Sequence, residues 1–209
     1  MKRAMIKRPA AGFTLIEAMV ALAIFGILMA VGVPRMTEWL SATRAGSAAG
    51  FYAEGYAMAR TQALSNNSQS RLVFTAVPNG QPDWQVDICV NTTDTPCTTD
   101  GNWSSTTGGA AGATGAAAGY RSIRRSGASL PPANLLIVTL GPDSGSSVYF
   151  TPVGWVDTSR NPRVTRIDLA PHASRAGAFR ASRVALTLAG VATTCDPSAA
   201  AGDSRRCPE

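Results

Sequence analysis

The most extended hydrophobic pattern in the chain is an apolar stretch near its start. Residues 13–33 read FTLIEAMVALAIFGILMAVGV, which is 21 residues with one charged side chain, Glu17. An α-helix rises 1.5 Å per residue, so this stretch spans roughly 30 Å, the thickness of the hydrocarbon core of a bilayer. Four cations lie in residues 1–8, and only Arg35 follows closely. The pattern predicts a transmembrane helix over 13–33, with residues 1–12 on the cytoplasmic side.

Residues 34–68 are predicted to continue the helix in amphipathic form. Positions spaced by three or four form one face that can pack on a domain: Ala48, Phe51, Gly55, Met58 and Gln62. Pro34 lacks an amide hydrogen and disfavours helix at Val33, so a kink at the membrane edge is expected there. Asn66 and Asn67 are the expected end of the helix.

After the helix the hydrophobic pattern changes to a period of two. In one such run Val184, Leu186 and Leu188 alternate with Arg183, Ala185 and Thr187. Turn residues such as those at 78–80, 141–143 and 161–162 separate the runs. The predicted strands are 71–76, 84–90, 134–140, 147–151, 163–169 and 183–189. The predicted fold class is therefore α+β: a long N-terminal helix packed on an antiparallel β-sheet head formed by residues 69–209.

Residues 91–132 do not follow this alternation. They contain Thr-, Gly- and Ala-rich stretches such as TTGGAAGATGAAAG and lack the apolar period of a core element. We expect an extended, partly flexible loop here, and we favour a tolerated insertion over a binding loop.

Charge and cysteine content bear on whether the chain binds nucleic acid or metal. The formal net charge is +6, but without residues 1–12 the chain has 15 cations and 13 anions, a net of +2, which is weak for a nucleic-acid-binding protein. The four cysteines form two pairs that are close in sequence. In an exported protein this favours the disulfides Cys89–Cys97 and Cys195–Cys207 over a metal site, because the spacing is not CxxC.

The sequence offers little basis for catalysis. His172 is the only histidine and lies in a loop-like setting, APHA, far from the cysteines. There is no phosphate-binding loop, and no Ser-His-Asp or metal-ligand spacing can be assembled. We therefore expect neither an enzyme nor a bound cofactor or metal.

Glu17 is the residue that most needs an explanation. A carboxylate within an apolar membrane segment is costly unless it has a partner, and it indicates function. A secretory signal peptide is the alternative reading of the N-terminus, but the small residues near 30–33 make a poor cleavage site.

The segment GFTLIE at residues 12–17 resembles the type IV prepilin motif at the head of an apolar helix. The resemblance implies that residues 1–12 are a leader, that a prepilin peptidase cuts between Gly12 and Phe13, and that the new amine of Phe13 is methylated. It also implies a partner for Glu17, the N-terminal ammonium of a neighbouring subunit in a filament. The chain is then expected in a bacterial inner membrane with its head in the periplasm, and later in a pilus or pseudopilus.

Two further segments resemble minor subunits of the FimU, FimT and GspH type. They are ARTQAL at 59–64 and FTPVG at 150–154, and their order along the chain agrees with that family. The likeness implies a rare subunit near the filament tip that helps to start assembly with other major and minor pilins.

The resemblance leaves three roles open. The chain could serve a type IV pilus, act as a minor pseudopilin of a type II secretion system, or bind DNA for natural transformation. One branch of the family binds DNA through Gly-Arg-x-Arg, where this chain has Gly190-Val191-Ala192-Thr193. Arg205 and Arg206 could contact phosphates weakly instead, as could Arg160, Arg163, Arg166, Arg175, Arg180 and Arg183. A solvated basic surface is nevertheless the favoured interpretation.

Overall fold

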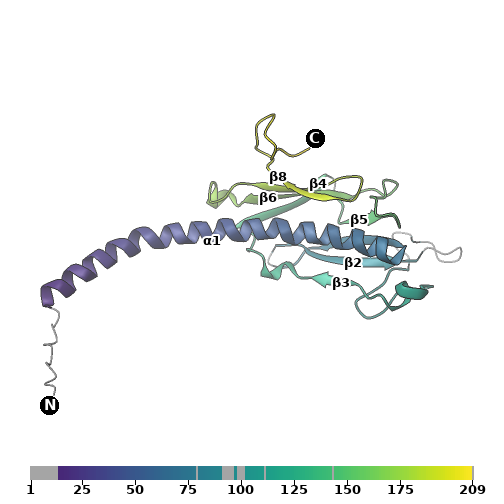
Figure 1. The fold of residues 1–209 in the computed structure, drawn as a ribbon, viewed down its shortest axis with the longest axis horizontal. Helices are drawn as coiled ribbons and strands as arrows, with labels where there is room; N and C mark the ends of the chain where they lie inside the picture. Colours follow the sequence, from purple (N-terminus) through teal and green to yellow (C-terminus); the bar gives the residue numbers. More distant parts are fainter. Residues whose placement is uncertain are drawn as a thin grey trace, which may run out of the picture. The chain divides into compact units, whose positions relative to one another are not determined.

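The computed structural model describes residues 14–78, 80–90, 97, 102–110, 112–142 and 144–208 (Figure 1). The chain divides into two compact units, residues 1–40 and 41–209. The helix α1, Leu15–Asn66, passes from the first unit into the second. Of the sequence-based predictions, those on the leader, on Gly12 and on Phe13 lie outside the described residues.

Helix α1 is continuous over 52 residues and contains Pro34. The hydroxyl of Thr37 donates a hydrogen bond of 2.7 Å to the carbonyl oxygen of Pro34. Proline removes one amide donor and is costly inside a helix, yet the helical backbone passes through it. Neither an unwound turn nor a helix end occurs at Pro34 in this structure.

The C-terminal end of α1 lies where the two asparagines predict it. Asn67 adopts a left-handed conformation with φ of 47°. Its amide donates to the carbonyl of Leu64 at 3.3 Å, and the amide of Ser68 donates to the carbonyl of Ala63 at 3.1 Å. This is the Schellman arrangement, which satisfies carbonyl groups of the last turn, and Asn is one of the few side chains that tolerates the required φ.

The strands form two antiparallel sheets. The first has the order β3-β2-β1-β5, built from Ile123–Arg125, Asp83–Cys89, Gln69–Thr75 and Ser147–Phe150. The second has the order β4-β6-β7-β8, built from Leu136–Pro142, Val164–Pro171, Ser182–Leu186 and Ala192–Cys195. Each of the six predicted strands overlaps an observed one, and the α+β architecture of a helix packed on antiparallel sheets is confirmed.

The hydrophobic core lies between the second half of α1 and the two sheets (Figure 1). Tyr52 and Tyr56 are fully buried and donate to backbone carbonyls on either side, of Pro82 at 3.2 Å and of Val164 at 3.1 Å. Burial raises the pKa of both hydroxyls above its ordinary value. Gly55 makes room for Trp84, whose ring would lie 3.2 Å from an added Cβ. The helix therefore serves as the central element of the head.

The segment 91–132 differs from the structureless stretch that the sequence predicts. Its described part contains β3 and two short 3-10 helices, Gly115–Gly119 and Gly127–Ser129. The β3 residues pair with β2 in the register Val86↔Ile123. Buried Asp83 accepts hydrogen bonds from Arg124, Ser126 and Gly127 and so fixes the chain after β3. The sequence pattern misses this part because polar and backbone contacts, rather than alternating apolar residues, hold it.

Candidate assembly site

The first part of α1 presents a continuous apolar surface. Every residue from Leu15 to Thr37 is exposed. The large apolar side chains among them are 47–81% exposed: Leu15, Ile16, Met19, Val20, Leu22, Ile24, Phe25, Ile27, Leu28, Met29, Val31, Val33 and Met36. By length and composition α1 is the single described helix that could cross a membrane. Apolar surface of this extent marks contact with lipid or with other proteins.

Glu17 lies in the first turn of α1, where it has a local structural role. The hydroxyl of Thr14 accepts a hydrogen bond of 3.3 Å from the Glu17 amide, which makes Thr14 the N-cap and Glu17 the third helical residue. Thr and Glu at this spacing are the residues of a capping box. A negative charge in the first turn also interacts favourably with the helix dipole.

The surroundings of Glu17 are otherwise apolar. Ile16, Val20, Ala21 and Ile24 line a shallow depression that includes Glu17. The depression therefore combines an apolar surface with one carboxylate. A partner segment that is apolar and carries one positive charge would complement it.

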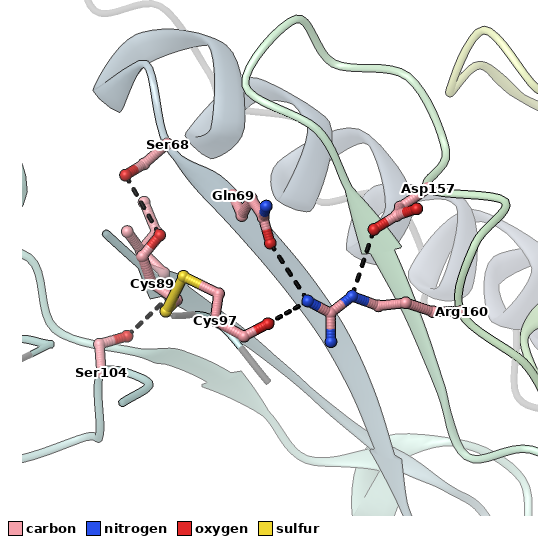
Figure 2. Close-up of a disulfide and its surroundings, with 8 residues drawn as sticks. Ser68, Gln69, Cys89, Cys97, Ser104, Asp157 and Arg160 are labelled. Carbon is pink, nitrogen blue, oxygen red and sulfur yellow. Dashed lines mark hydrogen bonds and ion pairs between the residues drawn. A yellow bond between two sulfur atoms is a disulfide. The ribbon is translucent and has the colours of Figure 1, made fainter. Parts of the chain in front are cut away.

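The head contains both disulfides that the sequence predicts. Cys89–Cys97 joins the end of β2 to the following segment, and Cys195–Cys207 closes a loop at the C-terminal end. Figure 2 shows the first disulfide between two sets of polar contacts. On one side the hydroxyl of Ser68 donates to the carbonyl of Cys89 at 3.3 Å, and Ser104 accepts the amide of Ile88 at 2.9 Å.

On the other side of this disulfide, Arg160 connects three parts of the head (Figure 2). Its guanidinium donates to the carbonyl of Cys97, to Asp157 at 3.2 Å and to Gln69 at 3.5 Å. It also lies 4.7 Å from the centre of the Tyr149 ring. Burial alone would raise the pKa of Asp157, but hydrogen bonds from Ser159 and Arg160 outweigh it and lower that pKa. The sequence gives no signal for this cluster, because its members are far apart in the chain.

Trp103 covers the outer face of the first sheet. Its ring lies 4.5 Å from the guanidinium of Arg71 and 5.7 Å from the ring of Tyr149. Arg71 in turn pairs with buried Asp87 at 2.7 Å. The segment after Cys97 is thus attached to the sheet by a disulfide, a cation–π contact and hydrogen bonds.

The arginines considered for phosphate binding are largely engaged in ion pairs within the head. Arg205 pairs with Asp203 at 2.8 Å, and this hydrogen bond lowers the pKa of Asp203 to about 2. The other pairs are Arg160–Asp157, Arg166–Asp168, Arg183–Asp168 and Arg180–Asp196. Arg206 lies beside Arg205 and is exposed. The nearby carboxylates offset much of the positive charge that phosphate binding would need.

His172 lies in an exposed turn and shares a hydrogen bond of 2.8 Å between its Nδ1 and the hydroxyl of Ser174. This geometry agrees with a local turn-forming role. Over the described ranges, no group of three His, Cys, Asp or Glu side chains is arranged to hold a metal ion.

Comparison with known proteins adds one finding. Residues 7–33 match the model of the prokaryotic N-terminal methylation motif. No curated protein and no solved structure matches the chain. The motif supports a type IV pilin or pseudopilin in general, and it implies processing by prepilin peptidase and assembly with other pilins.

Proposed function

We propose that the chain is a minor type IV pilin that helps to prime pilus assembly and forms part of the tip. In this proposal the peptidase cuts after Gly12 and methylates Phe13. The apolar part of α1 holds the protein in the inner membrane, with the head in the periplasm. The role is structural, with no catalysis and no cofactor. The observation that carries the proposal is Glu17, the single carboxylate in the exposed apolar part of α1 (residues 15–37), which begins within the methylation motif.

The local geometry supports a partner from another subunit. After cleavage, the cationic amine of Phe13 would directly precede the N-cap Thr14. A cation at a helix N-terminus opposes the helix dipole, whereas the carboxylate of a neighbouring Glu17 would neutralise it. In a low-dielectric filament core an unpaired charge is strongly destabilising. The pair would therefore define the axial register between subunits more than it adds stability.

The experiment is to replace Glu17 with Gln. Glutamine retains the length of the side chain and can still serve in a capping box, so only the charge is lost. We expect normal cleavage and membrane insertion, but at least about tenfold less of the protein in sheared filaments, equivalent to about 1.4 kcal/mol. The matched control is Glu54→Gln, which removes a charge from the same helix where Glu54 pairs with Arg125 on the head. Unchanged incorporation of Glu17→Gln would refute the proposed pairing.

The alternative roles predict different outcomes. A minor pseudopilin of the GspH type would share the same processing and the same dependence on Glu17, but its gene would lie among type II secretion genes. A DNA-binding pilin of the FimT type would shift DNA in a salt-dependent manner. The intramolecular ion pairs of the arginines favour the two non-DNA roles.

A further inference from the structure

Two charged residues bound the apolar run of α1. Glu17 and Arg35 enclose 17 uncharged residues, which span about 26 Å along a helix. The hydrocarbon core of a bilayer is about 30 Å thick and needs about 20 helical residues. The membrane-embedded window must therefore extend to or past at least one of the two charges.

Two limiting positions of the helix along the membrane normal meet this requirement, and we call them the inner and the outer register. In the inner register the window covers residues 13–32, which places Glu17 about 6 Å inside the hydrocarbon and Trp39 about 10 Å beyond its outer edge. In the outer register the window covers residues 17–36, which places Glu17 at the inner boundary. Trp39 then lies about 4 Å beyond the outer edge, within a headgroup layer that is about 5–7 Å thick on each side.

The side chains that follow the apolar run favour the outer register. Trp39 is 65% exposed, and its neighbours Met36 and Leu40 are 63% and 36% exposed. Met36 is best accommodated at the edge of the hydrocarbon. A tryptophan ring is amphipathic and is enriched at the headgroup level of membranes. Exposure to bulk water, as in the inner register, would leave this apolar surface uncovered.

Arg35 is compatible with the same placement. It lies four residues before Trp39, so both side chains are on one face of the helix. In the outer register its backbone is within one or two residues of the hydrocarbon edge. A long arginine side chain can extend from there to the phosphate groups of the headgroup layer.

We propose that Trp39, together with Arg35, binds the headgroup layer of the periplasmic leaflet and holds α1 in the outer register. Trp39 lies 22 positions after Glu17, so the two residues are about 33 Å apart along the helix and bracket the hydrocarbon. Glu17 is thereby held at the inner boundary, where it is accessible to the amine of an incoming subunit. This inference rests on the membrane insertion in the proposed function.

The test measures the depth of Trp39 by fluorescence quenching. The full chain is placed in phosphatidylethanolamine/phosphatidylglycerol vesicles that carry bromine either high on the acyl chain, at carbons 6 and 7, or deep, at carbons 11 and 12. The chain has four tryptophans, so the signal of Trp39 is the difference between the parent protein and Trp39→Phe. Trp155, 60% exposed in the head, provides the water-exposed reference through Trp155→Phe.

We expect the Trp39 signal to be quenched more by the shallow bromines than by the deep ones, and several-fold less by aqueous iodide than the Trp155 signal. Iodide quenching equal to that of Trp155, with no effect of bromine, would support the inner register and overturn the proposal. Stronger quenching by the deep bromines would also overturn it. Vesicle flotation separates the two claims: failure to float contradicts membrane insertion itself, whereas a floating protein with iodide-accessible Trp39 contradicts only the proposed register.

Discussion

Replacing Asp83 with Ala tests whether the segment around β3 is an integral part of the head. Asp83 is 2% exposed and lies at the start of β2. Its carboxylate accepts hydrogen bonds from both Nε and one Nη of Arg124 at 3.1 and 2.5 Å, from Ser126 at 3.2 Å and from the amide of Gly127 at 2.8 Å. The substitution removes all of these contacts at once.

The expected loss of unfolding free energy follows from these contacts. A hydrogen bond to a charged group contributes about 1.5–3 kcal/mol, which applies best to the buried Gly127 amide. The Arg124 side chain is 52% exposed, so its share is reduced by solvent screening to about 1 kcal/mol or less. We therefore expect Asp83→Ala to cost about 2–4 kcal/mol in total.

The assay is denaturant unfolding of the full chain in a mild detergent, followed by circular dichroism and by the fluorescence of buried Trp84. The matched control is Asp203→Ala, which also removes an aspartate paired with an arginine, but on the surface. The control is expected to lower the unfolding midpoint much less than Asp83→Ala does. A loss below about 0.5 kcal/mol for Asp83→Ala would refute the structural role of these contacts.

The same contacts predict a pH dependence. Burial alone would raise the pKa of Asp83, but the hydrogen bonds from Arg124, Gly127 and Ser126 outweigh it and lower that pKa. A carboxyl whose pKa is lower in the folded state stabilises the fold fully above its unfolded value of about 3.9. This stabilisation is lost as the pH falls through the lowered folded value. The difference between parent and Asp83→Ala should therefore be largest near neutrality and shrink in acid.

Three further predictions address other parts of the head. Gly190→Ala should destabilise the head more than Gly177→Ala. Both glycines have positive φ, of 76° and 85°. An added Cβ at Gly190 would lie 2.2 Å from the carbonyl oxygen of Gly154, whereas at Gly177 it would meet nothing within 4 Å. Equal denaturation midpoints would contradict the close packing at Gly190. Replacing Cys195 and Cys207 together with Ser should cost about 3 kcal/mol by loop entropy, and an unchanged midpoint under non-reducing conditions would show that this bond is not stabilising. DNA should produce no mobility shift near 0.15 M salt, whereas a salt-sensitive shift abolished by Arg205→Ala with Arg206→Ala would favour the DNA-binding role.

Local sequence patterns predict most of the helix and six of the strands. The two-residue period is clear in β1 and β7, where one face of each strand is buried. β2 also alternates in sequence, but it is buried on both faces. It fails for β3 and β8, which have three and four residues and read IRR and ATTC. Strands this short show no alternation, and their positions depend on partners far away in the chain, such as β2 for β3.

The candidate site shows a similar limit. The motif at residues 12–17 identifies Glu17, and the cysteine spacing predicts both disulfides. The contacts of Trp103, Arg71 and Arg160 could not be predicted, because each depends on the tertiary arrangement of separate loops. The contacts of Glu17 with a neighbouring subunit likewise could not be predicted, because they depend on how subunits pack in the filament.

The most direct test of the account is the intact mass and N-terminal sequence of the membrane-extracted protein, produced with and without a prepilin peptidase. The account predicts that the peptidase yields a chain beginning with N-methylated Phe13, and that the leader of residues 1–12 is retained in its absence. A chain that keeps residues 1–12 in the presence of the peptidase, or one cut near Val33, would contradict the assignment of Glu17 to filament assembly.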